Sequence, residues 1–193
     1  MSNRTLAHRL LAIGDSLTCG FPYPPDCSWV NLVSRQLRIL IINRGICGET
    51  AGDMLGRFAA EISAHKATAV IITGGSNDAY SGVGVREFRE QMAAMLEHAR
   101  GSGLAPVIGL PPPIIGREEA RLAEYRSSLR LLATEFAASI LDFYSPFIDA
   151  PSGKVRTGLF VDGVHPSLDG YAVMAEAAQP SLAGLIYGAE RKR

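Results

Sequence analysis

Five short runs of apolar residues recur along the chain, and longer stretches of mixed character separate them. Each run is too short for an ordinary helix, and none alternates apolar with polar residues as a strand with one wet face would. Continuous apolarity is typical of strands covered on both faces, as in a parallel sheet between two layers of helices. We therefore expect strands at "LLAIG" (10–14), "ILIINRG" (39–45), "AVIITGG" (69–75), "APVIGL" (105–110) and "SILDFY" (139–144).

The stretches between these runs have the periodicity of amphipathic helices. Ser28 and Thr50 can cap the first two, because a side-chain hydroxyl accepts a hydrogen bond from the free N–H groups at a helix start. In the last stretch Pro180 predicts an interruption or a kink, since proline cannot donate the helical hydrogen bond. We expect helices at 29–38, 51–65, 85–101, 117–138 and 167–188.

The alternation of strands and helices predicts an α/β fold, a three-layer α/β/α sandwich with a five-stranded parallel sheet. The expected strand order is the flavodoxin-like 2-1-3-4-5. No repeat, linker or low-complexity segment divides the chain, so residues 1–193 are expected to form one domain.

Charge and hydropathy argue against several classes of partner. The chain has nineteen acidic residues and nineteen lysines and arginines, and this balance disfavours nucleic acid as a partner. No apolar run reaches the roughly 18 residues of a membrane span, so integral membrane association is not expected. The N-terminal segment lacks the pattern of a secretory signal. We therefore expect a cytoplasmic location, unless a precursor segment is missing from the sequence.

The three cysteines, Cys19, Cys27 and Cys47, match no zinc-binding spacing. An odd number of cysteines cannot all pair within one chain. We expect free thiols and no bound metal. A local disulfide between Cys19 and Cys27 is the alternative if the protein is exported.

Polar residues gather where the strands end. Ser16 follows the first strand in "GDS", Gly48 follows the second in "NRGICGET", Asn77 follows the third in "GGSND", and "DGVHPS" precedes the last helix. Because the carboxyl ends of parallel strands meet at one edge of a sheet, we expect all four clusters at the same rim. Together they hold the residue types that acyl transfer needs: a nucleophile, a base, a group that orients the base, and donors to an oxyanion.

Ser16 needs a base, because an alcohol is a weak nucleophile at neutral pH. Imidazole, which titrates near pH 6.5, suits this role. Of the four histidines, His165 is the one in a turn at the expected rim. Asp162 can accept a hydrogen bond from one ring nitrogen and leave the other facing Ser16. The candidate oxyanion donors are the backbone N–H groups of Ser16 and Gly48 and the side-chain amide of Asn77.

Four blocks of the sequence, in this order, resemble those of the SGNH hydrolases, the GDSL family of esterases and lipases. One such block alone would be weak evidence for this family, whereas four blocks in this order at plausible spacing are a specific signal for it. The blocks are "GDSL" (14–17), the glycine of "NRGICGET" (43–50), "GSND" (75–78) and "DGVH" (162–165).

The resemblance implies a serine esterase that acts through an acyl-enzyme and needs no metal or organic cofactor. It implies that Ser16 is the nucleophile, His165 the base and Asp162 the group that orients it. It also implies that Ser16, Gly48 and Asn77 supply the oxyanion donors. Members of this family cleave carboxylic esters and sometimes thioesters.

The expected substrate is a small soluble ester, because the chain has no large insertion that could serve as a lid. The loop "FPYPPDCSW" (21–29), the prolines 111–113 and Tyr80 are expected to wall the pocket. Their apolar character suits a short or medium acyl group or an aryl group.

Two other interpretations give different chemistry or a different fold. A GxSxG nucleophile elbow is excluded, because the two candidate serines lie in "GDSLT" and "GGSND". A flavodoxin-like module that binds phosphate or a cofactor at "GDSLTCG", without hydrolase activity, is the alternative. It leaves Asn77, Asp162 and His165 without a role.

Overall fold

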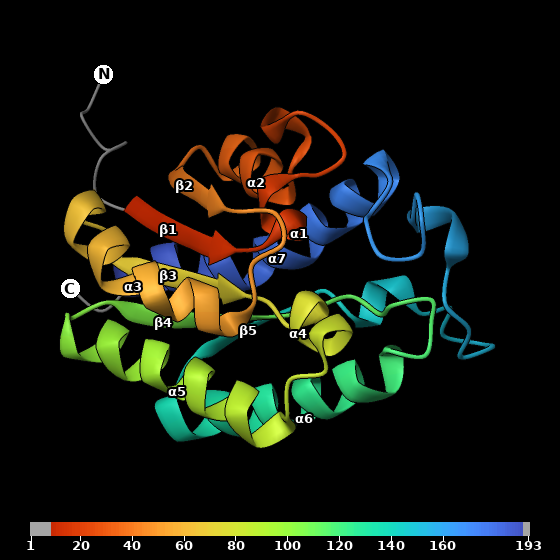
Figure 1. Ribbon diagram of the computed structural model, residues 1–193. Helices are drawn as coiled ribbons and strands as arrows, with labels where there is room; N and C mark the ends of the chain where they lie inside the picture. Colours follow the sequence, from red (N-terminus) through yellow and green to blue (C-terminus); the bar gives the residue numbers. More distant parts are fainter. Residues whose placement is uncertain (1–8, 191–193) are drawn as a thin grey trace.

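The computed structural model describes residues 9–190, and its centre is a parallel sheet of five strands. The strands are β1 (Arg9–Gly14), β2 (Leu40–Gly45), β3 (Ala69–Thr73), β4 (Ala105–Leu110) and β5 (Ser139–Asp142). Their order in the sheet is β2-β1-β3-β4-β5, which confirms the predicted order (Figure 1). Gly14 at the end of β1 pairs with Gly45 of β2 and Thr73 of β3, so these three strands end level with one another.

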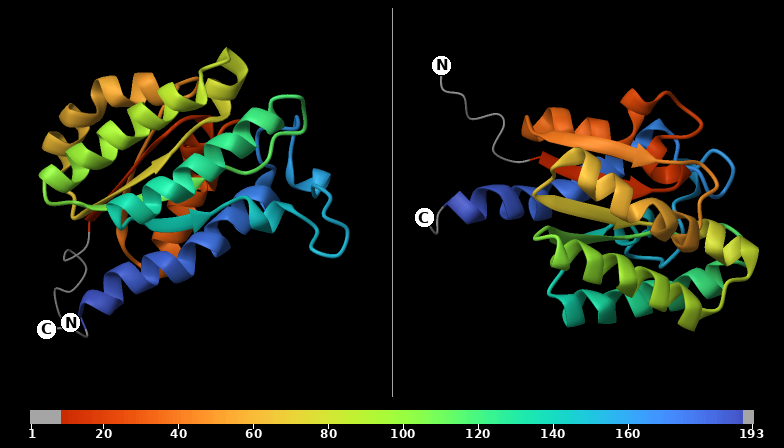
Figure 2. Two further views of the ribbon diagram at one scale, coloured as in Figure 1. Left: turned by 90° about the horizontal axis from the view of Figure 1, so that it is seen from below. Right: turned by 60° about the vertical axis from the view of Figure 1, so that its left-hand side comes forward.

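Helices connect the strands and cover both faces of the sheet. They are α1 (Ser16–Cys19), α2 (Trp29–Leu37), α3 (Ala51–His65), α4 (Ser76–Ser81), α5 (Val85–Gly101), α6 (Glu119–Phe136) and α7 (Leu168–Glu190), with 3₁₀ turns η2 (Pro25–Cys27), η3 (Ser145–Phe147) and η4 (Thr157–Leu159). Helices α3, α5 and α6 cover one face, and α2 and α7 cover the other (Figures 1 and 2). Within residues 9–190, no helix has both the length and the apolar character to cross a membrane.

Neighbouring residues of a central strand face opposite helix layers. In β1, Leu11 and Ile13 pack toward α3, α5 and α6, whereas Leu10 and Ala12 pack toward α2 and α7. Fully burying one side chain of the size of leucine stabilises the fold by roughly 1.5–3 kcal/mol. A polar residue on either face would lose this gain, which is why residues 10–13 of β1 and 69–72 of β3 are apolar without interruption.

Both predicted N-caps are present at the helix starts. Ser28 Oγ accepts a hydrogen bond from the Val30 N–H at 3.1 Å, at the beginning of α2. At the beginning of α3, Thr50 and Asp53 cap each other's backbone N–H groups in a capping box. A cap contributes about 1 kcal/mol to stability. The start of α3 is therefore well defined, with its N-cap Thr50 two residues after Gly48.

The structure differs from the predicted elements at several points: β5 ends at Asp142, two residues before its predicted end, and the short helices α1 and α4 have no predicted counterpart. The third strand ends at Thr73, because Gly75 has a φ of +120° and this value lies outside the strand region. Helix α7 continues without a break through Pro180, so an interruption there is wrong, whereas a kink stays a prediction. Ala178 and Leu182 on either side of Pro180 are buried in the core. Their packing offsets the hydrogen bond that proline cannot make.

Asp15 lies between β1 and α1 and is buried. Its Oδ1 accepts a hydrogen bond from the Leu17 N–H at 2.9 Å and caps α1. In the part of the chain that the structure describes, Oδ2 has no hydrogen-bond partner. Burial disfavours the charged form and raises the pKa of Asp15 to about 7. The fold thus holds a protonated carboxylic acid beside Ser16 at mildly acidic pH.

The buried carboxyl of Asp15 predicts a pH-dependent stability. The folded protein keeps this proton up to about pH 7, whereas an unfolded chain releases it near pH 4. Between these values the folded state binds more protons, so the free energy of unfolding falls as pH rises. Asp15→Asn has no such proton. Urea unfolding should show the wild type losing up to about 1.4 kcal/mol per pH unit relative to Asp15→Asn between about pH 5 and 7. A difference that stays constant over this range would contradict the prediction.

Candidate active site

The loops at the strand ends bring Ser16, His165 and Asp162 into contact. Ser16 begins α1 directly after β1, and His165 lies in the loop 160–167 that precedes α7. Ser16 Oγ is 3.1 Å from His165 Nε2, and His165 Nδ1 is 2.7 Å from Asp162 Oδ2. A hydroxyl, an imidazole and a carboxylate linked in this way can move the hydroxyl proton to the ring as the oxygen attacks a carbonyl group.

Hydrogen bonds within the loop 160–167 hold Asp162 and His165 in this arrangement. Asp162 Oδ1 accepts from the backbone N–H groups of Val164 at 3.0 Å and His165 at 2.8 Å. The Val161 N–H donates to the His165 carbonyl at 2.8 Å. Burial opposes ionisation of Asp162, but the hydrogen bonds from His165 and Val164 outweigh it and hold the pKa of this carboxyl below its ordinary value. Asp162 is therefore a carboxylate at neutral pH.

The His165 ring also packs against an aromatic side chain. Phe21 meets it edge to face, with the ring centroids 4.7 Å apart. The Phe21 carbonyl accepts a hydrogen bond of 2.7 Å from the hydroxyl of Tyr171, a buried residue of α7. The His165 imidazole is thus restrained in two ways. The carboxylate of Asp162 is hydrogen-bonded to it, and the Phe21 ring, whose backbone is bonded to Tyr171 of α7, packs against it.

The three candidate oxyanion donors lie at the ends of β1, β2 and β3. The Ser16 N–H is in the first turn of α1, where a helix leaves its N–H groups without intrahelical partners. Gly48 follows β2 with a φ of +85°, a conformation that favours glycine. A Cβ atom at Gly48 would meet no atom within 4 Å, so conformation and not a close approach calls for glycine. Asn77 Nδ2 donates to the Glu49 carbonyl at 2.8 Å, which leaves a second N–H for another acceptor.

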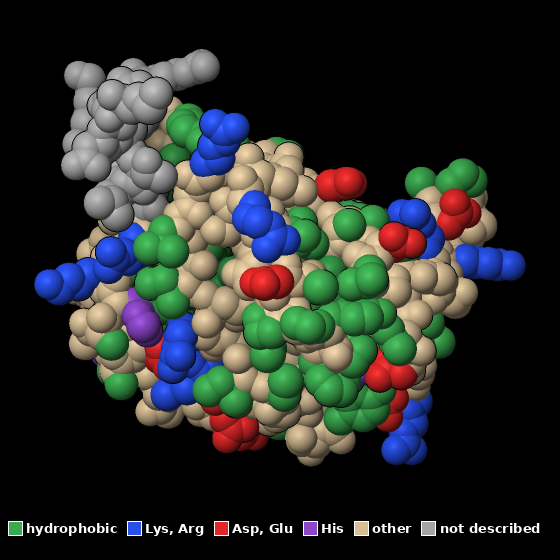
Figure 3. Space-filling view, turned by 90° about the horizontal axis from the view of Figure 1, so that it is seen from above, with side chains coloured by type: hydrophobic (Ala, Val, Ile, Leu, Met, Phe, Trp, Pro, Cys, Tyr) green, Lys and Arg blue, Asp and Glu red, His purple; other side chains and the backbone are tan. Residues whose placement is uncertain are grey.

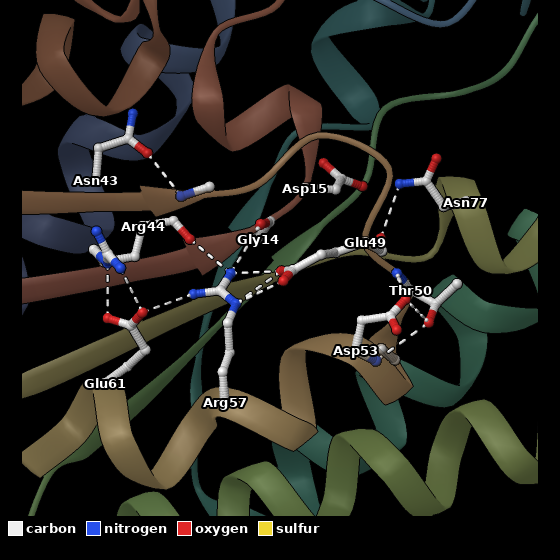
Figure 4. Close-up of polar contacts among 12 residues, drawn as sticks. Gly14, Asp15, Asn43, Arg44, Glu49, Thr50, Asp53, Arg57, Glu61 and Asn77 are labelled. Carbon is white, nitrogen blue, oxygen red and sulfur yellow. Dashed lines mark hydrogen bonds and ion pairs between the residues drawn. The ribbon is translucent and has the colours of Figure 1, made fainter.

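Three charged side chains beside the site are not foreseen from the sequence. Asp78 is buried, and its carboxylate accepts from the Ala51 N–H at 3.0 and 3.2 Å, which links α4 to the start of α3. Burial raises the pKa of Asp78. Glu49 and Arg57 form an ion pair of 2.6 Å next to Gly48 (Figure 4). The cluster "SND" is the sequence signal that could have pointed to Asp78. Arg57 has no such signal, because a charged residue in a helical stretch is typical of a solvated face.

The three cysteines are free thiols in the structure, and the alternative disulfide between Cys19 and Cys27 is absent. Cys47, the residue before Gly48, is exposed. Partial desolvation of this thiol, together with the neighbouring thiol of Cys19, raises the pKa of Cys47, so Cys47 is protonated at neutral pH. Among residues 9–190, no three or more His, Cys, Asp or Glu side chains gather in a way that could hold a metal ion.

Apolar side chains surround the loop 160–167 at the surface. Phe21, Tyr80, Ile115 and Val161 are each between 45% and 54% exposed. In Figure 3, hydrophobic side chains gather toward the end of the molecule to which the strand arrows of Figure 1 point. The prolines 111–113, which were expected to wall the pocket, are buried. The exposed apolar surface beside the site therefore does not include these prolines.

Comparison with known proteins gives a consistent family. A family model described as the GDSL-like Lipase/Acylhydrolase family matches residues 12–173. "Esterase TesA" of Pseudomonas aeruginosa is 26% identical to this chain over 194 residues, which cover 96% of this chain and 93% of that protein. "Thioesterase 1/protease 1/lysophospholipase L1" of Escherichia coli (strain K12) is 26% identical, and the match covers 93% of this chain and 86% of that protein.

A solved structure agrees with the sequence comparisons. A lipolytic protein of the G-D-S-L family from Desulfitobacterium hafniense is 32% identical, with a TM-score of 0.83, and the match covers 90% of this chain and 98% of that one. The family resemblance of the four sequence blocks is therefore confirmed over nearly the whole chain. This chain belongs to the GDSL-like lipase/acylhydrolase family and is an ester-hydrolysing enzyme with an α/β/α fold.

Proposed function

We propose that the enzyme is a serine esterase that hydrolyses small carboxylic esters, with thioesters as a second substrate class, through an acyl-enzyme on Ser16. The observation that carries this proposal is the hydrogen-bonded chain from Ser16 Oγ through the His165 ring to Asp162. The names of the relatives from Pseudomonas aeruginosa and Escherichia coli, an esterase and a thioesterase, support both substrate classes.

In the first half of the reaction, Ser16 Oγ attacks the acyl carbon while His165 Nε2 takes its proton. The carboxylate of Asp162 stabilises the imidazolium that forms. Negative charge develops on the acyl oxygen, where the N–H groups of Ser16, Gly48 and Asn77 can donate to it. Each such donor is typically worth about 100- to 1,000-fold in rate. The imidazolium then gives its proton to the departing alkoxide or thiolate, and the acyl group stays on Ser16.

In the second half, water attacks the acyl-enzyme. His165 Nε2 takes a proton from the water, and the same three donors stabilise the second oxyanion. The bond to Ser16 Oγ then breaks, the carboxylic acid leaves, and the imidazolium returns a proton to the serine. None of these steps uses a metal ion or an organic cofactor.

The apolar residues at the surface of the site suit a short or medium acyl group or an aryl group. Phe21 and Tyr80 offer aromatic faces, and Ile115 and Val161 offer aliphatic ones. The alternative, a module that binds phosphate at the start of α1, is not favoured. The Leu17 N–H at that helix start already donates to the Asp15 carboxyl, an acidic group that would repel a phosphate once ionised.

Removing the hydroxyl of Ser16 tests the nucleophile. Ser16→Ala is expected to lower kcat/KM for p-nitrophenyl acetate and butyrate by about 1,000-fold or more, because alanine cannot form the acyl-enzyme. Mass spectrometry after treatment with a fluorophosphonate should show one adduct on the wild type and none on Ser16→Ala. Cys19→Ser removes the nearby thiol and is expected to react like the wild type. Equal labelling of the wild type and Ser16→Ala would contradict the assignment.

Replacing the carboxylate of Asp162 tests the base. Asp162→Asn is expected to lower kcat/KM for p-nitrophenyl acetate by about 100-fold, because a neutral amide cannot stabilise the imidazolium that forms when His165 takes the Ser16 proton. The matched control is Asp149→Asn, an exposed loop carboxyl that caps a turn in the same manner. A kcat/KM of Asp162→Asn that stays within about threefold of the wild type would contradict the proposal.

A further inference from the structure

The side chain of Glu49 is held by a guanidinium group of α3. Arg57 Nε lies 2.8 and 2.9 Å from the two carboxylate oxygens of Glu49, and Arg57 Nη2 lies 2.6 Å from Oε2 (Figure 4). The side chains are only 13% and 17% exposed. A forked, charge-assisted contact of this kind is both stronger and more directional than an exposed ion pair.

The same guanidinium group also binds the ends of two strands. Arg57 Nη2 donates to the Arg44 carbonyl at 2.8 Å, near the end of β2, and reaches the Gly14 carbonyl at 3.5 Å, at the end of β1. The Gly14 carbonyl also accepts from the Ile46 N–H at 2.9 Å. Arg57 therefore ties the loop after β2 to the strand that leads into Ser16.

Glu49 continues this connection to the third strand end. Its backbone carbonyl accepts the 2.8 Å hydrogen bond from Asn77 Nδ2, and its backbone is joined directly to Gly48. One N–H of the Asn77 amide is thereby fixed, which sets the direction of the other. Glu49 is thus bonded through its backbone to two candidate oxyanion donors and through its side chain to Arg57.

We infer that Glu49 and Arg57 are positioning residues, which hold the N–H groups of Gly48 and Asn77 where the oxyanion develops. The inference rests on the proposed esterase mechanism. Oxyanion donors act only from a narrow range of positions, and a displacement of about 1 Å in an active site can cost about 100-fold in rate. Among the hydrogen bonds of residues 9–190, neither Glu49 nor Arg57 bonds to the loop 160–167, so the pair acts on the donors and leaves the base alone.

Two conservative variants test this inference. Glu49→Gln removes the charge but keeps an oxygen acceptor, and Arg57→Lys keeps the charge but removes the fork. Each is expected to lower kcat and kcat/KM for p-nitrophenyl acetate by about 10- to 100-fold, because the lost contact matters most in the transition state. KM should stay within about twofold, and the acid limb of the pH profile should stay where it is in the wild type. A loss that appears in KM, or a shifted acid limb, would overturn the inference.

The matched control is Glu61→Gln. It removes a carboxylate from α3, the helix that carries Arg57, and from the group of charges that Arg57 contacts. Glu61 pairs with Arg44 at 2.7 Å and with Arg57 at 3.3 Å, but it does not contact Glu49 in the described structure. Thermal unfolding should show that Glu61→Gln is destabilised, while its kcat stays within about twofold of the wild type. If Glu61→Gln loses as much kcat as Glu49→Gln, the effect is one of general stability and the positioning role is wrong.

The double variant Glu49→Gln/Arg57→Lys asks whether the two residues act as a unit. If they do, the double variant should lose about as much kcat as the more damaging single variant, because the second change removes a contact already broken. Losses that multiply would show two independent effects and would overturn the paired role.

A readout that needs no turnover separates this inference from the proposed function. In an amide ¹H–¹⁵N spectrum, Arg57→Lys should shift the Gly48 N–H and the Asn77 side-chain NH₂ signals, although neither residue is next to Arg57 in sequence. Unchanged signals would overturn the positioning role even in an active esterase. Shifted signals support it even if the wild type hydrolyses esters no faster than Ser16→Ala, a result that would overturn only the proposed function.

Discussion

Because helices cover both faces of the parallel sheet, its strands can present polar groups to a ligand only where they end. Leu10 and Leu11, neighbours in β1, already face different helix layers. The level ends of β1, β2 and β3 then place three polar loops side by side. The position of the candidate site is therefore a consequence of how the core is buried.

The site is held together in two different ways. Asp162 and His165 lie in one short loop, and hydrogen bonds within that loop fix their contact. The candidate donors at Gly48 and Asn77 come from separate segments, and contacts through Glu49 and Arg57 connect them across three strand ends. A local turn forms wherever its own residues allow it, whereas contacts between distant segments depend on the packing of the whole sheet. The positions of the candidate donors at Gly48 and Asn77 thus depend more on the packing of the core than the position of the candidate base His165 does.

Much of this could be predicted from the sequence, because the signals are local. Uninterrupted apolar runs mark buried strands, and Ser28 and Thr50 mark helix starts. The roles of Ser16, His165 and Asp162 remain predictions, although the structure brings the three together. Arg57 could not be predicted, since it meets Glu49 and two backbone carbonyls only after the strands align. The alternative of an interruption at Pro180 is wrong for the opposite reason: the packing of α7 against the core keeps the helix continuous, and the local sequence does not report this packing.

Ser16 and His165 are 149 residues apart in the chain, although Oγ and Nε2 are 3.1 Å apart in the fold. During synthesis the serine leaves the ribosome first, and at about 5–20 residues per second the histidine follows on the order of ten seconds later. In that interval the serine has no imidazole beside it, and α7 has not yet covered its face of the sheet. On the proposed mechanism, a nascent chain is therefore inert toward esters until His165 has been made, and α7, which completes the core, follows directly after it in the sequence.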